Sequence, residues 1–241
     1  MKLATGVIPV RYQSSRFPGK ALAPILGKPM IQRVYERAKE AEHLDQVIIA
    51  TDDERIFEAA KKFKARVMMT SPLHNSGTER VAEVAKKIEA PVILNIQGDE
   101  PLLEGKMIDE LVEVLQDKSI PMASLMTKVS DLGLLHDSDR VKVVVNKEGY
   151  ALYFSRSPLP FQATDYFFHH IGIYAFQRDF LLKFIQLNPS RLEKTEKLEQ
   201  LRVLENGYRI KMIETEFPTL SVDTPQDIIK VEEILKKRAD E

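Results

Sequence analysis

The sequence predicts an α/β fold in which a mainly parallel sheet is followed by a smaller β-rich insertion. Over the first half, short apolar runs alternate with longer amphipathic segments, which is the pattern of βα units. After about residue 128, strand-like runs follow one another and are separated by loops rich in Ser, Asp and Pro. We therefore predict a core over residues 1–127, an insertion over 128–214, and a strand and helix over 215–241 that return to the core.

The core is predicted from runs of strand length and from helical spacing between them. Two intervening segments, 29–43 and 104–116, carry apolar side chains at helical spacing, and Pro29 suits a first helical position. A further helix is predicted to begin at Thr78. The five predicted strands of this half are 3–10, 46–51, 66–70, 91–96 and 122–127.

The insertion is predicted to contain strands at 141–145, 151–154, 169–176 and 208–213, and helices at 178–186 and 191–205. The second helix is predicted to stop at Asn206-Gly207, as a helix C-terminus does. A strand at 220–222 and a helix at 225–237 are predicted to complete the core. The sequence has no internal repeat and no low-complexity linker.

Composition excludes several classes of function. The 241 residues include 35 Lys and Arg against 36 Asp and Glu, a net charge of −1, so the basic excess typical of nucleic-acid-coating proteins is missing. The chain has no Cys, which excludes disulfides, thiolate zinc sites and thiol nucleophiles. The sequence has neither a signal-peptide pattern nor an apolar run long enough for a membrane span. We expect a cytoplasmic protein with neither nucleic acid nor membrane as a partner.

The loop after the first strand concentrates cations and hydrogen-bond donors. Arg11, Ser14, Arg16 and Lys20 lie within ten residues that contain no acidic side chain. Such a group at the carboxyl end of a first strand suits a triphosphate. The loop matches neither a Walker A motif nor G-x-G-x-x-G. A solvated basic loop is the alternative interpretation.

Carboxylates follow two other predicted strands. Gln97-Gly98-Asp99-Glu100 ends one strand, and Asp223 stands between a strand and a helix. Mg²⁺ that bridges to substrate phosphates needs only one or two protein carboxylates, so Asp99 and Asp223 are candidate metal ligands. Alternatively, Asp99 or Glu100 caps the following helix.

The Ser76-Gly77-Thr78-Glu79-Arg80 segment offers backbone, hydroxyl and guanidinium groups suited to a nucleotide base, or it is simply a capped loop. Among the histidines, His169 and His170 are adjacent on a predicted strand and so point to opposite faces. His43, His74 and His136 are interpreted as surface or loop residues. No HExxH pattern supports histidine-based zinc chemistry.

Nine segments occur in the order found in the 3-deoxy-manno-octulosonate cytidylyltransferases, also called CMP-Kdo synthetases, and the chain resembles that family over its whole length. The segments are IPVRYQSSRFPGK, ATDD, SGTER, NIQGDEP, VKVV, ALYFSR, HIGIY, LEQLR and VDTPQD. The resemblance implies a Rossmann-like three-layer sandwich of the nucleotide-diphospho-sugar transferase type. It also implies a homodimer that binds CTP and a Kdo-type sugar acid.

The activity implied by the resemblance is transfer of the cytidylyl group of CTP to Kdo (3-deoxy-D-manno-octulosonate) with Mg²⁺, giving CMP-Kdo and pyrophosphate for bacterial lipopolysaccharide synthesis. The implied catalytic residues are Lys20, Arg16 and Asp99. The implied nucleotide-binding residues are Arg11, Ser14, Arg16, Lys20, Ser76, Gly77, Arg80 and Gln97. Asp99 and Asp223 match the metal-binding aspartates. The implied sugar-binding residues are Arg156, His170, Tyr174, Glu199 and Gln200.

Three alternatives stay open at this point. The same reaction could act on a Kdo analogue with an amino group at position 8, because SSRFPGK and IQRVYERA also resemble that branch. It could act on a sialic-type nonulosonate. The chain could also bind nucleotides without catalysis, although Asp99 and Asp223, two candidate metal ligands, argue against this.

Overall fold

A computed structural model describes residues 4–13, 17–217 and 219–239. They form two compact units: a first unit of Met1–Asp109 with Pro218–Glu241, and a second unit of Glu110–Phe217. The predicted insertion, 128–214, lies within the second unit. The unit also includes the strand at 122–127 that we assigned to the core. This strand pairs with strands of the second unit, which is why it belongs there.

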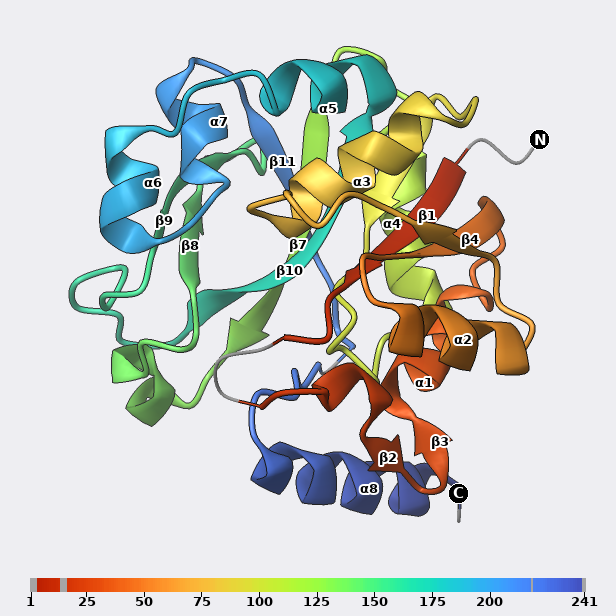
Figure 1. Cartoon of the computed structure of the whole chain (residues 1–241). Coiled ribbons are helices and arrows are strands. Elements are labelled where there is room, and N and C mark those ends of the chain that lie inside the picture. The colour runs from red at the N-terminus through yellow and green to blue at the C-terminus, as the bar shows by residue number, and fades with distance from the viewer. Residues whose placement is uncertain (1–3, 14–16, 218, 240–241) are drawn as a thin grey trace. The chain divides into compact units, whose positions relative to one another are not determined.

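The sheet of the first unit contains four parallel strands in the order β6-β1-β4-β5 (Figure 1). In the central register, Val7 of β1 lies opposite Ile48 of β4 and Asn95 of β6. Parallel strands are covered on both faces, so they read as continuous apolar runs, and this is why the sequence predicted all four. The strands are β1 (Ala4–Val10), β4 (Leu44–Thr51), β5 (Val67–Met69) and β6 (Val92–Asn95).

Three helices connect these strands: α1 (Met30–Ala38), α2 (Glu54–Lys62) and α3 (Gly77–Lys86). Asp53 caps α2 and Ser76 caps α3, each through a side-chain oxygen that accepts a backbone N–H. We did not predict α2 from the sequence, although Asp53 is a suitable cap. Pro29 is not the first helical residue, because it pairs with Pro24 in a two-stranded hairpin of β2 (Pro24–Ile25) and β3 (Lys28–Pro29).

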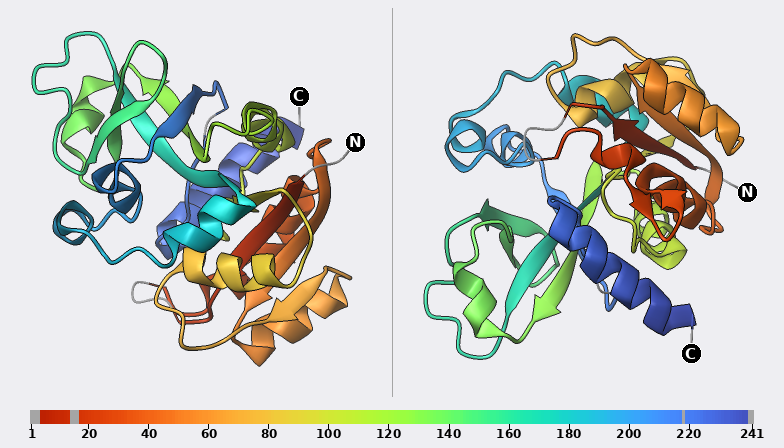
Figure 2. Two further views of the ribbon diagram at one scale, coloured as in Figure 1. Left: turned by 90° about the horizontal axis from the view of Figure 1, so that it is seen from above. Right: turned by 60° about the horizontal axis from the view of Figure 1, so that its bottom comes forward.

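The last helix, α8 (Pro225–Ala239), packs beside the β2–β3 hairpin, as the right-hand view of Figure 2 shows. Together they bury an apolar cluster that includes Ile25, Met30, Leu102, Val222 and Val231. The predicted strand at 220–222 is wrong, since these residues belong to no strand. Besides this packing, the described part of the segment is joined to the rest of the first unit by a backbone hydrogen bond from Val222 N to Asp99 O at 2.9 Å and by side-chain contacts such as Leu26 N to Glu232 Oε1 at 2.8 Å.

The sheet of the second unit is mixed. Strand β7 pairs parallel with β11 and antiparallel with β10, while β8 pairs antiparallel with β10 and with β9. The register of β10 against β7 shifts between Ile171 and Tyr174, which is a β-bulge. The strands are β7 (Met122–Val129), β8 (Lys142–Val145), β9 (Ala151–Ser155), β10 (Phe167–Gln177) and β11 (Ile210–Glu214).

The helix predicted at 191–205 is broken into α6 (Arg191–Glu196) and α7 (Leu201–Glu205). Lys197 ends α6 with φ 56°, a left-handed conformation that stops a helix even without Gly. The other helices are α4 (Gly105–Val114), which contains the boundary between the units, and α5 (Arg178–Phe184). No helix in the described residues has both the length and the apolar character needed to cross a bilayer.

Candidate functional site

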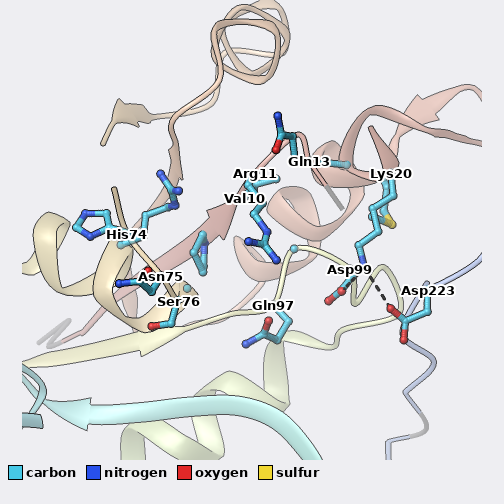
Figure 3. A pocket seen from close by; sticks show the side chains of 16 residues that line it. Val10, Arg11, Gln13, Lys20, His74, Asn75, Ser76, Gln97, Asp99 and Asp223 are labelled. Atoms are coloured by element: carbon cyan, nitrogen blue, oxygen red, sulfur yellow. Dashed lines mark hydrogen bonds and ion pairs between the residues drawn. The ribbon is translucent and has the colours of Figure 1, made fainter. Parts of the chain in front are cut away.

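A cavity of about 350 Å³ opens in the first unit, where β1 and β6 end. Its walls come from the loop after β1, the loop before α3, the segment after β6 and the segment before α8 (Figure 3). Ligands of α/β sheets bind at the carboxyl ends of the strands, so this is the expected place for a nucleotide. The lining residues include Arg11, Lys20, Ser76, Gly77, Arg80, Gln97, Asp99 and Asp223.

Lys20 joins the two candidate metal-binding aspartates. Its Nζ lies 2.6 Å from Asp99 Oδ2 and 3.4 Å from Asp223 Oδ1, and it also donates to Val222 O at 3.0 Å. Figure 3 shows the Lys20 side chain extending toward both carboxylates. Two aspartates that are far apart in sequence therefore face one cation. The sequence suggested that Asp99 and Asp223 could share a metal but could not show that they lie close together.

The donor set of Asp99 and Asp223 fits a hard divalent cation. Across the described residues, no group of three or more His, Asp or Glu side chains could hold a metal on its own. A pair of carboxylates is nevertheless sufficient for Mg²⁺ when phosphate oxygens and water complete its coordination. Because one cation, the Lys20 ammonium, already lies between both carboxylates, their spacing allows them to share a positive charge.

Glu100 differs from the neighbouring Asp99 because it is buried. Burial raises the pKa of Glu100 to about 8; the charges of Asp99 and Asp223 add to this increase, and Lys20 opposes it. Its Oε2 is buried without a hydrogen-bond partner in the described structure. Glu100 is therefore mainly protonated at neutral pH, so it adds little negative charge to the cluster.

The loop after β1 carries the predicted phosphate-binding residues. Arg11 extends into the cavity between Lys20 and the loop before α3 (Figure 3). Ser14 and Arg16 lie outside the described residues. The loop is closed by Gly19, whose left-handed φ of 74° lets its N–H donate to Tyr12 O at 2.9 Å. The Tyr12 ring in turn lies 3.3 Å from the Arg55 guanidinium.

The loop before α3 is held close to β1. Ser76 Oγ accepts from Glu79 N at 3.2 Å, which fixes the first turn of α3. A Cβ at Gly77 would lie 3.2 Å from Pro9 Cγ, so the loop packs tightly on the end of β1. The backbone N–H groups at the start of α3 thus lie at the cavity wall, where they can meet an anionic or polar ligand. Gln97 lines the same cavity after β6.

Arg80 lines the cavity, but most of the hydrogen bonds of its guanidinium go to other protein side chains. It is 4% exposed, and its Nη2 donates to Asp52 Oδ2 at 2.8 Å. Its Nη1 donates to Thr70 Oγ1. We infer that Arg80 contributes to the site mainly by tying α3 to the end of β4.

His74 lies in the loop before α3, as predicted, and it also lines the cavity. Its Nε2 lies 2.7 Å from Glu83 Oε2. Burial acts to raise the pKa of Glu83, but hydrogen bonds from Lys87, Ser71 and His74 outweigh it and lower this pKa to about 2. The ionised Glu83 therefore fixes the His74 ring. The only signal in the sequence is its position two residues before Ser76.

The predicted sugar-binding residues all lie in the second unit. Arg156 donates from Nε to Glu196 O at 3.2 Å and from Nη1 to Ser138 O at 2.9 Å. Its main chain is held by Lys142, which is fully buried. The Lys142 Nζ donates to three carbonyl oxygens, those of Asp137 at 2.9 Å, Arg140 at 2.7 Å and Arg156 at 2.6 Å.

His170, Tyr174, Glu199 and Gln200 occupy β10 and the segment before α7. The rings of His170 and Tyr174 lie 5.4 Å apart. Burial lowers the pKa of His170 to about 3, with a smaller contribution from His169. Burial raises the pKa of the Tyr174 hydroxyl, and Glu199 adds to this. Gln200 is buried, and its Nε2 has no partner in the described structure. These histidine and tyrosine side chains are neutral at pH 7.

Comparison with known proteins places the chain in a family. A family profile described as "Cytidylyltransferase" matches residues 5–213. Proteins named 3-deoxy-manno-octulosonate cytidylyltransferase from Geotalea uraniireducens and Geobacter sulfurreducens are 51% and 48% identical to this chain. The alignments cover 97% and 96% of this chain and 99% of each relative.

A solved structure agrees with the sequence comparisons. It is described as CMP:2-keto-3-deoxy-manno-octonic acid synthetase complexed with CTP, and it is 41% identical to this chain. The match covers 98% of this chain and 99% of the other, with a TM-score of 0.93. A 4-diphosphocytidyl-2C-methyl-D-erythritol synthase from Anaerococcus prevotii, 14% identical with a TM-score of 0.67, shares the fold. The chain therefore belongs to the cytidylyltransferase family and, within it, to the 3-deoxy-manno-octulosonate cytidylyltransferases.

Proposed function

We propose that the protein transfers the cytidylyl group of CTP to Kdo, giving CMP-Kdo and pyrophosphate. The proposal is supported by the names of the relatives, which match nearly the whole chain at about half identity. It is also supported by the 41% identical synthetase that was solved with CTP. The observation on this chain that carries it is the Lys20, Asp99 and Asp223 cluster at the carboxyl end of a parallel sheet.

In the proposed reaction, the anomeric hydroxyl oxygen of the sugar forms a bond to the α-phosphorus of CTP. The bond between that phosphorus and the bridging oxygen breaks, and pyrophosphate leaves with the electron pair while the hydroxyl proton passes to water. Both substrates are anions, so charge neutralisation and in-line positioning dominate the catalysis. Arg11 and Lys20 supply positive charge from this chain, and Arg16 is proposed to join them.

We propose that Asp99 and Asp223 hold Mg²⁺. When bound there, Mg²⁺ would neutralise charge on the phosphate oxygens. In this proposal, Lys20 exchanges carboxylate partners for phosphate oxygens when the nucleotide binds. Ser76, Gly77, Gln97 and the Arg80-held loop are proposed to contact the cytidine. Arg156, His170, Tyr174, Glu199 and Gln200 are proposed to contact the sugar.

The test is pyrophosphate release from CTP with Mg²⁺ and Kdo, compared with an Asp99→Asn variant. The 8-amino analogue and a nonulosonate are assayed in parallel at equal concentration. We expect the highest kcat/KM with Kdo and loss of activity when Mg²⁺ is chelated. Release that does not exceed the level of the Asp99→Asn variant with any of the three sugars would rule out the proposed activity.

We further propose a cytoplasmic homodimer that supplies activated sugar for lipopolysaccharide synthesis. Sedimentation equilibrium should give twice the chain mass of 27.6 kDa, and cell fractionation should place the protein with cytoplasmic markers. A monomer at micromolar concentration, or recovery with membranes, would contradict this part.

A further inference from the structure

Ser124 contacts His170 and lies opposite Tyr174, two of the predicted sugar-binding residues, although no motif pointed to it. It belongs to β7, is fully buried, and faces the bulge in β10. Its Oγ lies 2.8 Å from Ile173 O, 3.2 Å from Ile171 O and 2.9 Å from His170 Nε2. One hydroxyl thus meets two carbonyl oxygens and one imidazole nitrogen.

The single proton of the Ser124 hydroxyl determines which of these contacts it donates and which it accepts. A serine hydroxyl has one proton to donate and two lone pairs to accept with. Two carbonyl oxygens can only accept, and a bare oxygen pair at 2.8 Å would be repulsive, so the proton goes to Ile173 O with Ile171 O sharing it. Ser124 Oγ must then accept from His170, which therefore carries its proton on Nε2. The network assigns the tautomer, because hydrogen positions follow from such networks.

The bulge is what creates this geometry. Between Ile171 and Tyr174 the pairing of β10 with β7 shifts, so Leu125 faces Ile171 while Ser124 faces Tyr174. Regular antiparallel pairing would not direct the Ile171 and Ile173 carbonyls to one side chain. The extra residues turn both carbonyls toward Ser124 and set the positions of the His170 and Tyr174 rings on either side of the bulge.

The environment of His170 keeps this tautomer neutral. The side chain is buried, its ring makes an edge contact with Phe154 at 5.0 Å, and it lies beside Tyr174. Burial holds its pKa far below neutrality. Within the described residues, no hydrogen bond to Nδ1 is present, so the Nδ1 lone pair is available as an acceptor.

We propose that Ser124 is a positioning residue that fixes His170 as the Nε2–H tautomer, so that Nδ1 accepts a hydrogen bond from a hydroxyl group of the sugar acid. The inference rests on the proposed function. The inference also limits which group of the sugar can bind His170. An unprotonated Nδ1 can only accept a hydrogen bond, so it can pair with a hydroxyl group but not with the sugar's carboxylate. His170 then contacts a hydroxyl group of the substrate and not its carboxylate.

The direct test is long-range ¹H–¹⁵N NMR of histidine in the whole protein, which distinguishes Nε2–H from Nδ1–H. The chain has only five His, and the signals absent from a His170→Asn variant identify this ring. In the wild-type protein we expect the Nε2–H pattern, unchanged between pH 6 and 8. In Ser124→Ala we expect a shift toward Nδ1–H, because Nε2–H loses its acceptor.

Kinetics supplies the second readout. Loss of one positioning hydrogen bond should raise KM for Kdo in Ser124→Ala by about tenfold, with KM for CTP changed less than about twofold. Ser124→Thr, which keeps the hydroxyl, should restore both the tautomer and most of the KM. Thr215→Val is the matched control, since it removes another buried hydroxyl of the second unit. It should leave the His170 signals unchanged.

The outcomes separate this inference from the proposed function. An Nδ1–H pattern in the wild-type protein overturns the inference, and this measurement stands even if Ser124→Ala does not fold. An unchanged tautomer, or an unchanged KM for Kdo, in a folded Ser124→Ala protein overturns it as well. If the wild-type protein releases no pyrophosphate with any sugar, the proposed function fails, whereas the tautomer result remains valid by itself.

Discussion

The two units hold their candidate site residues in different ways. In the first unit, charged side chains neutralise each other: Lys20 pairs with Asp99 and Asp223, and Arg80 pairs with Asp52. In the second unit, ion pairs are not the main contacts at His170 and Arg156: main-chain carbonyls accept from the Ser124 hydroxyl beside His170 and from Lys142 beside Arg156, although Glu199 pairs with Arg202 at 3.7 Å. In the first arrangement, a charged side chain can leave its protein partner and pair with a charged ligand. In the second, hydrogen bonds hold the side chains in fixed positions.

This difference suits the two proposed substrates and the units proposed to bind them. A triphosphate brings several negative charges. Side chains such as Lys20 can move from a carboxylate to a phosphate oxygen with little rearrangement of the surrounding protein. A sugar acid presents mainly hydroxyl groups, which need donors and acceptors at fixed positions. Single substitutions in the first unit should therefore act mainly through charge, and those in the second through geometry and protonation.

The largest expected effect is at Lys20. Lys20→Met leaves Asp99 and Asp223 without the ammonium group they share and removes a positive charge from the proposed phosphate site. We expect kcat/KM for pyrophosphate release to fall about 10³-fold. Lys28→Met, which removes an exposed lysine paired with Glu36, is the matched control and should retain near wild-type activity. Equal losses in both variants would show that the effect is not specific to the cluster.

A moderate effect is expected at the Arg80 ion pair. Asp52→Asn leaves a guanidinium that is 4% exposed without its counter-charge. We expect the free energy of unfolding to fall by about 2 kcal/mol, measured in urea, and KM for CTP to rise. Glu40→Gln breaks the more exposed pair with Arg37 and should change stability by less than about 0.5 kcal/mol. Similar values for both variants would contradict the role we assign to burial.

In the second unit, the expected effect depends on pH. Burial lowers the pKa of His169 to about 4, so between pH 6.5 and 4 the unfolded chain binds a proton that the folded chain does not. Stability therefore falls as pH decreases through this window. His169→Asn keeps a donor for Val141 O and should flatten this decrease by up to about 1.4 kcal/mol per pH unit.

The measurement is urea unfolding at several pH values between 7.5 and 4. Above pH 7 both proteins bind no proton at this position, so their stabilities should be comparable there. Parallel curves across the whole range would mean that His169 does not contribute to the acid sensitivity of the second unit.

The smallest effect is expected at Arg55, whose guanidinium stacks on Tyr12 beside the phosphate loop and pairs with Asp53 at 2.7 Å. The side chain is 58% exposed, so solvent screens both contacts. We expect Arg55→Ala to change KM for CTP at most about twofold. A change above tenfold would show that this exposed stack orders the phosphate loop, and that the first unit also relies on fixed shape.

Local sequence signals predicted much of this architecture. The parallel strands of the first unit are continuous apolar runs, and Asp99 lies a few residues after the end of one of them, β6. The meeting of Asp99 and Asp223 could not be predicted, because it depends on tertiary packing of Val222 and α8 against the first unit. Lys20 was assigned to phosphate, and its pairing with both aspartates became visible only from their arrangement in space.

The failures have physical reasons. The helix predicted at 191–205 breaks at Lys197, a residue type that carries no helix-stop signal. The bulge opposite Ser124 depends on strand pairing, which is a non-local property. His74 is a loop residue as predicted; that it also lines the cavity depends on where α3 begins, which its local sequence context does not show. Ser14 and Arg16 lie outside the described residues, so their predicted roles stay predictions.

The order of residues along the chain has a consequence for biosynthesis. The second unit is continuous in sequence, whereas the first is completed only by Val222, Asp223 and α8, which follow it. Chains grow from the N-terminus and fold domain by domain. On the ribosome, the second unit can thus form before the aspartate pair exists. A nascent chain therefore carries no assembled Lys20–Asp99–Asp223 cluster until Asp223 and α8 have left the ribosome.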